Sequence, residues 1–207
     1  MRTRLTGFTL IELAVVMFVI TLLLSSLMVP LQTQVEQRQI ADTEKALNEI
    51  RDALLGFAVA YGRLPCTDTD ADGAENSPCA GVPSPPEGLL PWKSLGVTGT
   101  DPWGNAWRYR PHRSFSQAFL LTTQTSTTDN MRVRNASGTE LTSSQERAAA
   151  LVFSLGSNRT ADGENASFEA SSANYQSDIR TTNFDDVLIW IGRPTLFNRM
   201  VTAGKLP

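Results

Sequence analysis

Residues 7–30 read GFTLIELAVVMFVITLLLSSLMVP, and this stretch decides how the N-terminal part of the chain folds. Apolar residues dominate it, and no charged residue lies between Leu13 and Val29. Such a run is longer than the apolar core of an ordinary secretory signal and reaches the short end of the range for membrane-spanning helices. Two arginines precede it. The sequence therefore predicts a membrane-spanning helix over residues 8–30 and a basic leader over residues 1–7, which stays in the cytoplasm.

Glu12 is the only acidic residue in this stretch. An ionisable side chain in apolar surroundings is costly unless an opposite charge pairs with it. The residues GFTLIE closely resemble the type IV prepilin signature, in which a dedicated peptidase cleaves after the glycine and methylates the new N-terminus. The resemblance implies cleavage after Gly7, methylation of Phe8, and pairing of Glu12 with the N-terminal amine of a neighbouring subunit. A plain signal anchor, in which Glu12 has no such role, is the alternative interpretation.

Residues 31–62 continue the helical pattern and are expected to form an amphipathic helix. Apolar residues fall three and four positions apart, which places them on one face. The face predicted to pack on a sheet consists of Leu47, Ile50, Leu54, Phe57 and Tyr61. Gly62, followed by Leu64 and Pro65, predicts the end of this helix.

Residues 63–207 are expected to form a globular head with a small antiparallel sheet. The predicted strands are 107–110, 115–123, 148–155 and 186–191. Residues 122–146 are rich in Ser, Thr and Asn and predict a long exposed loop, and the C-terminal tail favours a short helix. The predicted fold class is α+β and pilin-like: a long N-terminal helix, membrane-spanning in its first half, packed on the sheet.

Cys66 and Cys79 are the only cysteines of the chain. They lie in a segment rich in proline, glycine and acidic residues, for which we expect little regular structure. In an exported protein a disulfide is the expected state, and closing so short a loop contributes roughly 3 kcal/mol in the entropic model. A free-thiol or redox role is the alternative.

Residues 68–73 read DTDADG, which matches the opening of a calcium-binding loop. Cys79 occupies the twelfth position, where an EF-hand has glutamate, so an EF-hand is excluded. A looser calcium loop remains possible, and a solvated acidic turn is the alternative. The candidate ligands are Asp68, Asp70, Asp72 and Glu75.

Three later stretches, DPWGNAWRY, FSLGSNRTADGENAS and FDDVLIWIG, resemble the head of the major pseudopilin of type II secretion. In that family a late loop binds structural calcium through backbone carbonyls and acidic side chains. By position, the resemblance implies that the ligands here are Leu155, Asn158, Asp162, Asp185 and Asp186. The chain departs from the family pattern by offering Asn158 where an aspartate is usual, and by a longer insertion before Asp185. The stretches GRLPC and GLLPWKSLG also resemble a group of proteobacterial minor pilin-like proteins.

Composition excludes several function classes. The formal net charge of −3 provides no basic field, so nucleic acid is an unlikely partner. The chain has one histidine, and no nucleotide-binding loop or nucleophile elbow occurs, so we expect no enzyme. A membrane-anchored enzyme that uses the N-terminal helix for export only is therefore disfavoured.

The resemblance implies a structural subunit, a minor pilin or pseudopilin, of a type IV pilus or a type II secretion pseudopilus. Its expected partners are prepilin peptidase, other pilin subunits and an inner-membrane assembly platform. Its expected location is the bacterial inner membrane as a single-pass protein with a periplasmic head, and then a periplasmic or surface filament. The alternative is a filament-tip binding module that recognises DNA, a glycan or a secreted substrate.

Overall fold

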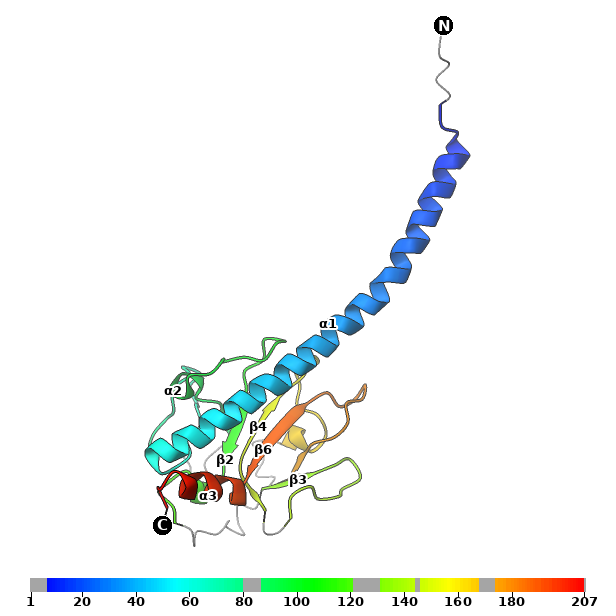
Figure 1. Cartoon of the computed structure of the whole chain (residues 1–207). Helices are drawn as coiled ribbons and strands as arrows, with labels where there is room; N and C mark the ends of the chain where they lie inside the picture. The colour runs from blue at the N-terminus through cyan, green and yellow to red at the C-terminus, as the bar shows by residue number, and fades with distance from the viewer. Residues whose placement is uncertain (1–6, 80–86, 121–130, 144–145, 168–173, 207) are drawn as a thin grey trace. The chain divides into compact units, whose positions relative to one another are not determined.

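The computed structural model describes residues 7–79, 87–120, 131–143, 146–167 and 174–206, without the side chains of residues 25–32. The chain divides into an N-terminal unit, Met1–Ala41, and a C-terminal unit, Asp42–Pro207. Helix α1 (Leu10–Tyr61) contributes to both units (Figure 1). The other described elements are β1 (Gly88–Leu89), α2 (Trp92–Leu95), β2 (Arg108–Pro111), η1 (Arg113–Phe115), β3 (Arg132–Arg134), β4 (Ala148–Ser154), η2 (Gly163–Ser167), β5 (Asn174–Gln176), β6 (Val187–Gly192) and α3 (Arg193–Thr202).

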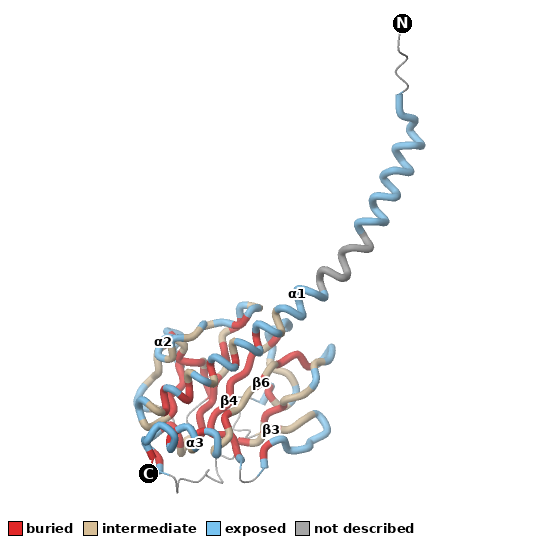
Figure 2. Tube along the Cα trace, viewed as in Figure 1, coloured by how far each residue is buried: buried red, intermediate tan, exposed pale blue. Residues whose placement is uncertain are grey.

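Helix α1 begins directly after Thr9, in a capping box that Thr9 forms with Glu12. The Glu12 backbone N–H donates a hydrogen bond to Thr9 Oγ1 at 3.3 Å, and the Thr9 backbone N–H donates to Glu12 Oε2 at 3.5 Å. These bonds satisfy N–H groups that have no partner in the first turn of a helix. In residues 10–24, every large hydrophobic side chain is 44–87% exposed (Figure 2). The N-terminal unit therefore presents an uncovered apolar helix.

The prediction that residues 8–30 span a membrane is corrected by the structure. Within the described part of the chain, no helix combines the length and the apolar character that crossing a membrane requires. The apolar part of α1 with described side chains, residues 10–24, is shorter than the roughly 20 residues that a span needs. Residues 25–30 of the predicted span lie outside the described side chains. The same finding leaves a single-pass location in the inner membrane without support.

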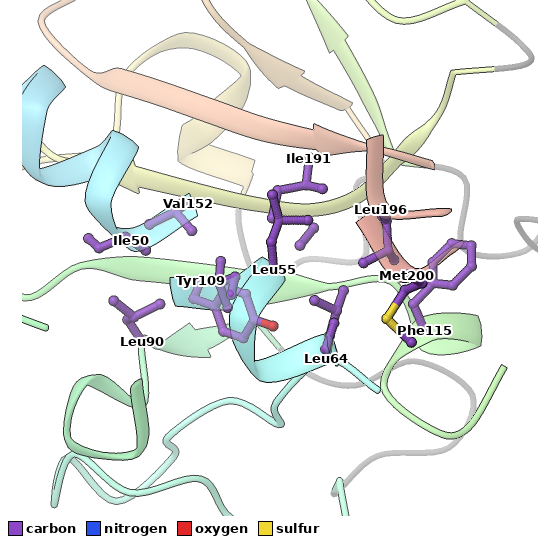
Figure 3. Close-up of a cluster of buried hydrophobic side chains, with 14 of the residues drawn as sticks. Ile50, Leu55, Leu64, Leu90, Tyr109, Phe115, Val152, Ile191, Leu196 and Met200 are labelled. Atoms are coloured by element: carbon purple, nitrogen blue, oxygen red, sulfur yellow. The ribbon is translucent and has the colours of Figure 1, made fainter. Parts of the chain in front are cut away.

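The core of the C-terminal unit lies between α1, α3 and one face of the main sheet. Leu47, Ile50 and Leu54 of α1 are fully buried, as their spacing predicts. They share a cluster with side chains of the sheet and of α3, among them Tyr109, Val152, Ile191, Leu196 and Met200 (Figure 3). The predicted α+β packing of a helix on an antiparallel sheet is confirmed for this unit.

Tyr61 is an error in the predicted apolar face, because 66% of it is exposed. It lies in the last turn of α1, and its ring contacts Phe57 with the ring centroids 4.3 Å apart. Ala58, which follows Leu54 by four positions and is fully buried, continues the buried face instead. The small alanine side chain lets the end of the helix approach the core.

The main sheet has the strand order β1-β2-β4-β6, and all its described pairings are antiparallel. Every residue of β4 is buried, because apolar layers cover both faces of this strand. Val152 faces the helix-side cluster, whereas Leu151 and Phe153 join a second cluster on the opposite face. Strands β2, β4 and β6 confirm three of the predicted strands within one residue at each end, and α3 confirms the predicted C-terminal helix.

The second cluster is closed by a small parallel sheet, β3 with β5, that the sequence analysis missed. Met131 directly before β3, Val133 of β3 and Tyr175 of β5 are at most 1% exposed in this cluster. The prediction of an exposed loop over residues 122–146 is therefore wrong for this part, while residues 121–130 and 144–145 lie outside the described residues.

The predicted strand over residues 115–123 is also wrong. Phe115 ends the short 3-10 helix η1, and residues 116–120 form no strand. Phe115 is fully buried and packs edge-on against Phe119 and Phe197. The apolar residues of this segment therefore fill the core from a loop. Residues 121–123 of the prediction fall outside the described residues.

Candidate functional site

The predicted cleavage point lies in an exposed, non-helical segment. Gly7, Phe8 and Thr9 precede the first residue of α1, and Phe8 is 80% exposed. A Cβ atom added to Gly7 would meet no other atom within 4 Å. The Gly7–Phe8 peptide bond is therefore accessible to another protein, and nothing in the described fold itself requires glycine at this position.

Glu12 has a local role that the sequence analysis missed. Its carboxylate accepts the Thr9 backbone N–H and lies in the first turn of α1, where a negative charge is favourable. The pattern T-x-x-E over residues 9–12 is a known start signal for helices and could have revealed this role. Pairing of Glu12 with the N-terminus of a neighbouring subunit stays a prediction.

Cys66 and Cys79 form the predicted disulfide, with their Cα atoms 5.0 Å apart. Near its base, both terminal nitrogens of Arg63 donate to the Glu75 carboxylate at 2.8 Å, and the Cys66 backbone N–H donates to it at 2.9 Å. Although burial opposes its ionisation, these bonds lower the pKa of Glu75. Glu75 therefore fastens the loop to Arg63, and the carboxylates that the structure groups together are those of Asp68, Asp70 and Asp72 without it.

The first acidic cluster brings together Asp68, Asp70 and Asp72, whose carboxylate oxygens lie within 4.8 Å of one another. Asp68 is buried, but its Oδ1 accepts the backbone N–H of Ala71 and its Oδ2 that of Gly73, both at 2.7 Å. The other two aspartates are exposed. In this cluster the buried carboxylate stabilises the turn, so the geometry favours a solvated acidic turn over a metal site.

A second group, here called the aspartate cluster, consists of Asp162, Asp185 and Asp186, also within 4.8 Å of one another. The Asp185 backbone N–H donates to Asp162 Oδ2 at 2.9 Å. The Asp162 backbone N–H in turn donates to Asp186 Oδ2 at 2.9 Å. Asp185 is 7% and Asp186 3% exposed. Two chain segments thus hold three carboxylates together in a largely buried place.

In both buried aspartates, Asp185 and Asp186, one carboxylate oxygen accepts hydrogen bonds and the other accepts none. Asp185 Oδ2 accepts three hydrogen bonds, from Ser157 N and Oγ and from Asn158 N, at 2.6–3.0 Å. Asp186 Oδ2 accepts the Asp162 N–H and the Asn165 amide at 2.9 Å. Among the described residues, Asp185 Oδ1 and Asp186 Oδ1 have no hydrogen-bond partner and are buried. Such oxygens are costly unless a cation or a proton satisfies them.

The electrostatics of the aspartate cluster indicate that its negative charges lack a balancing positive charge. Burial, together with the charges of Asp162 and Asp185, raises the pKa of Asp186 to about 7. Within the described residues, the Arg180 guanidinium lies 3.9 Å from Asp185 Oδ2. One arginine does not balance three carboxylates. The donor set of hard, anionic oxygens is the kind that calcium prefers.

The other two predicted ligands behave differently. Asn158 turns its amide nitrogen toward Asp162, at 3.0 and 3.1 Å from the two carboxylate oxygens, while its Oδ1 accepts from Thr160. It therefore acts as a donor to the cluster. Leu155 packs its side chain against the second core cluster, and the described contacts do not place its carbonyl among the carboxylates. Ser157 and Arg180, which do contact Asp185, were missed because their residue types carry no metal-binding signal.

A buried network supports the loop below the aspartate cluster. Asp101 accepts hydrogen bonds from the Ser154 hydroxyl at 2.5 Å and from the Asn105 amide at 2.9 Å. The same amide donates to the Gly156 carbonyl at 2.8 Å. Gly156 has φ +64°, and a Cβ there would lie 2.5 Å from Asp185. The close approach of the DPWGN turn, the SLG loop and Asp185 thus requires glycine at this position.

We expect the stability of the chelated protein to fall as the pH rises from about 4 to about 7. Because the pKa of Asp186 is raised from 3.8 to about 7, the folded state holds this proton in a range where the unfolded chain has released it. The stabilisation is complete below about pH 4 and is lost as the pH passes 7. Thermal melting of the Asp186→Asn variant should show a markedly flatter profile, and an equal decline in both proteins would contradict this assignment.

No protein-family model, curated protein or solved structure matches this chain.

Proposed function

We propose that the chain is a pilin-like structural subunit, cleaved after Gly7 and assembled into a filament through the N-terminal part of α1. The observation that carries the proposal is the uncovered apolar surface of residues 10–24, which begins within the prepilin-like residues GFTLIE. Large contiguous apolar surfaces on a folded chain mark places where another surface binds. Here the sequence signature and the exposed surface lie in one segment.

The occupant that we propose for this surface is the same segment of neighbouring subunits. Burying apolar side chains contributes about 25 cal/mol per Å² removed from water, so helices with exposed aliphatic residues along their length gain from packing on one another. Glu12 is the only charged residue in this segment. In a packed filament its carboxylate needs a cation, and the free amine that cleavage creates on Phe8 of a neighbour supplies one.

A structural Ca²⁺ in the aspartate cluster is the second part of the proposal. Asp162, Asp185 and Asp186 would hold the ion, and the two buried, unpartnered oxygens support this assignment. The ion would fix the loop of residues 155–162 against the segment before β6. The remaining ligands that calcium requires would come from backbone carbonyls or water.

The disulfide supports an exported location for the C-terminal unit, since such bonds persist mainly outside the cytoplasm. The partners that we propose are prepilin peptidase, other pilin-like subunits and an assembly platform. We propose no catalytic role. The single histidine, His112, is fully buried, and its Nδ1 accepts the backbone N–H of Ser114.

Glu12→Ala and Glu12→Gln are both expected to be cleaved normally but to be at least tenfold depleted from sheared filaments. Glutamine can keep the capping box, whereas only glutamate carries the charge. The pair of variants therefore separates a capping role from a pairing role. Immunoblots of the filament and cell fractions would measure both steps.

Glu44→Gln is the matched control, because Glu44 is an exposed glutamate of the same helix outside the apolar segment. It should assemble as the unmodified chain does. Normal incorporation of Glu12→Gln would show that the charge of Glu12 is not needed, and would overturn the proposed pairing.

A further inference from the structure

Strand β6 forms one edge of the main sheet and, among the described residues, pairs with β4 alone (Figure 1). An edge strand leaves alternate backbone N–H and C=O groups without a strand partner. The opposite edge is covered, because Asp68 and Leu89 of β1 exchange backbone hydrogen bonds at 2.9 and 3.0 Å. Within the described part of the sheet, the edge at β6 is therefore the one that can accept a further strand.

The residues of β6 do not protect this edge. Native edge strands are commonly shielded by charged side chains, by proline or by very short length. Strand β6 reads VLIWIG and is six residues long. Ile189 packs with the helix-side cluster and Trp190 with the second cluster, and both remain half-buried. Since side chains alternate between the faces of a sheet, an added apolar strand would extend the core on both faces.

An open cavity of about 670 Å³ lies beside this edge, between α1, α3 and β6. The sheet residue in its lining is Trp190, and the other lining residues belong to α1 and α3. Because no residue of β4 is part of the lining, the cavity lies on the edge side of β6. A side chain of a strand added to β6 could therefore enter it.

The cavity suits an acidic side chain. Among the described residues, no hydrogen bond or ion pair engages the Arg199 side chain. Arg51 approaches Asp52 at 3.9 Å, but the two side chains are 42% and 75% exposed, so this pair is weak. With two arginines and one aspartate, the lining is net positive in a chain of net charge −3. Planar guanidinium groups match the geometry of a carboxylate.

We propose that β6 and this cavity bind an extended, apolar segment of a partner protein that carries an acidic residue. The segment adds to the sheet as a strand, so that backbone hydrogen bonds give affinity and side chains give specificity. Its acidic side chain enters the cavity and meets Arg51 and Arg199. A second copy of β6 fits this site less well, because VLIWIG offers no acidic side chain. Binding of such a segment does not depend on cleavage after Gly7 or on filament assembly.

A synthetic peptide tests the proposal on the full chain in detergent. The probe alternates threonine and valine around one central glutamate, has blocked ends and carries a fluorophore for anisotropy. Two further probes carry N-methyl groups on alternate residues, so that each lacks the hydrogen-bond donors of one edge of the peptide strand. We expect one methylated probe to bind as the parent does, and the other to bind at least tenfold more weakly. Equal binding of both methylated probes would exclude strand pairing and overturn the proposal.

Arg199→Gln tests the acidic contact. Arg199 is exposed, so the variant should keep its melting temperature. It should bind the glutamate probe about tenfold more weakly, and it should bind a probe with glutamine in place of glutamate as the unmodified chain does.

Lys45→Gln is the matched variant, because it removes one positive charge from α1 outside the cavity. It should bind the glutamate probe as the unmodified chain does. The proposal is overturned if the probe does not bind at millimolar concentration, or if Arg199→Gln binds it as well as Lys45→Gln. Dimers of the unmodified chain that the probe dissociates would place a second copy on β6, and would also overturn the proposal.

Discussion

Replacing Gly7 with isoleucine is expected to leave the leader on nearly every molecule. A peptidase that recognises glycine before the cleaved bond would not accept a branched side chain there. The fold does not oppose the change, because a Cβ atom at position 7 meets no described atom within 4 Å. Loss of cleavage would therefore report recognition by the peptidase and not misfolding. The measurement is the mobility of the protein on immunoblots from cells that make the peptidase.

Gly56→Ala is the control for this experiment. Gly56 lies in α1, and a Cβ there also meets nothing within 4 Å, so the change is sterically neutral. This variant should lose its leader normally. If Gly7→Ile is shortened as fast as Gly56→Ala, the proposed cleavage point is wrong.

Calcium is expected to raise the melting temperature of the chelated protein by on the order of 5–10 °C at pH 7. An ion present at about one hundred times its Kd stabilises the folded state by about 2.7 kcal/mol. In a chain of this size each kcal/mol shifts the melting temperature by roughly 2–4 °C. Asp186→Asn should abolish most of the rise, because it removes a charge at the centre of the aspartate cluster.

Asp72→Asn separates the two acidic clusters. Asp72 is an exposed member of the first cluster, so this variant should keep the full response to calcium. If calcium still raises the melting temperature of Asp186→Asn but not that of Asp72→Asn, the ion binds in the first acidic cluster and not in the aspartate cluster. An unchanged melting temperature with millimolar calcium would contradict both sites.

Local patterns made much of the C-terminal unit predictable. The buried face of α1 follows from the spacing of Leu47, Ile50 and Leu54, which is set by the helix itself. Strand β4 appears as a continuous apolar run because it is covered on both faces. Where the pattern of apolar residues within one helix or strand decides which side chains are buried, the sequence is sufficient to predict that burial.

The sequence did not predict the elements whose structure depends on packing against distant parts of the chain. Strands β3 and β5 have three residues each, and their one strongly apolar residue apiece, Val133 and Tyr175, is too little pattern to mark a strand. Residues 115–123 suggested a strand because Phe115 and Phe119 are apolar. These two side chains instead fill the core from η1 and from the loop that follows it. The uncharged run before residue 30 likewise suggested a membrane span that the described part of α1 does not support.

The candidate site was predicted in part. Asp162, Asp185 and Asp186 came from a resemblance to a family loop, and the structure brings them together. Glu75 was assigned by proximity in sequence to the first acidic cluster. The structure pairs it with Arg63 instead, a partner twelve positions away that no local pattern reveals. Donors such as Ser157 become visible only once the loop is folded.

The N-terminal residue of the protein isolated from cells that make prepilin peptidase tests the central proposal most directly. N-terminal sequencing with intact-mass measurement would identify both the residue and any methyl group. We predict a chain that begins at N-methylated Phe8, directly before the capping box that starts α1. A chain that keeps Met1, or that begins at any residue other than Phe8, would contradict the assignment as a processed pilin-like subunit.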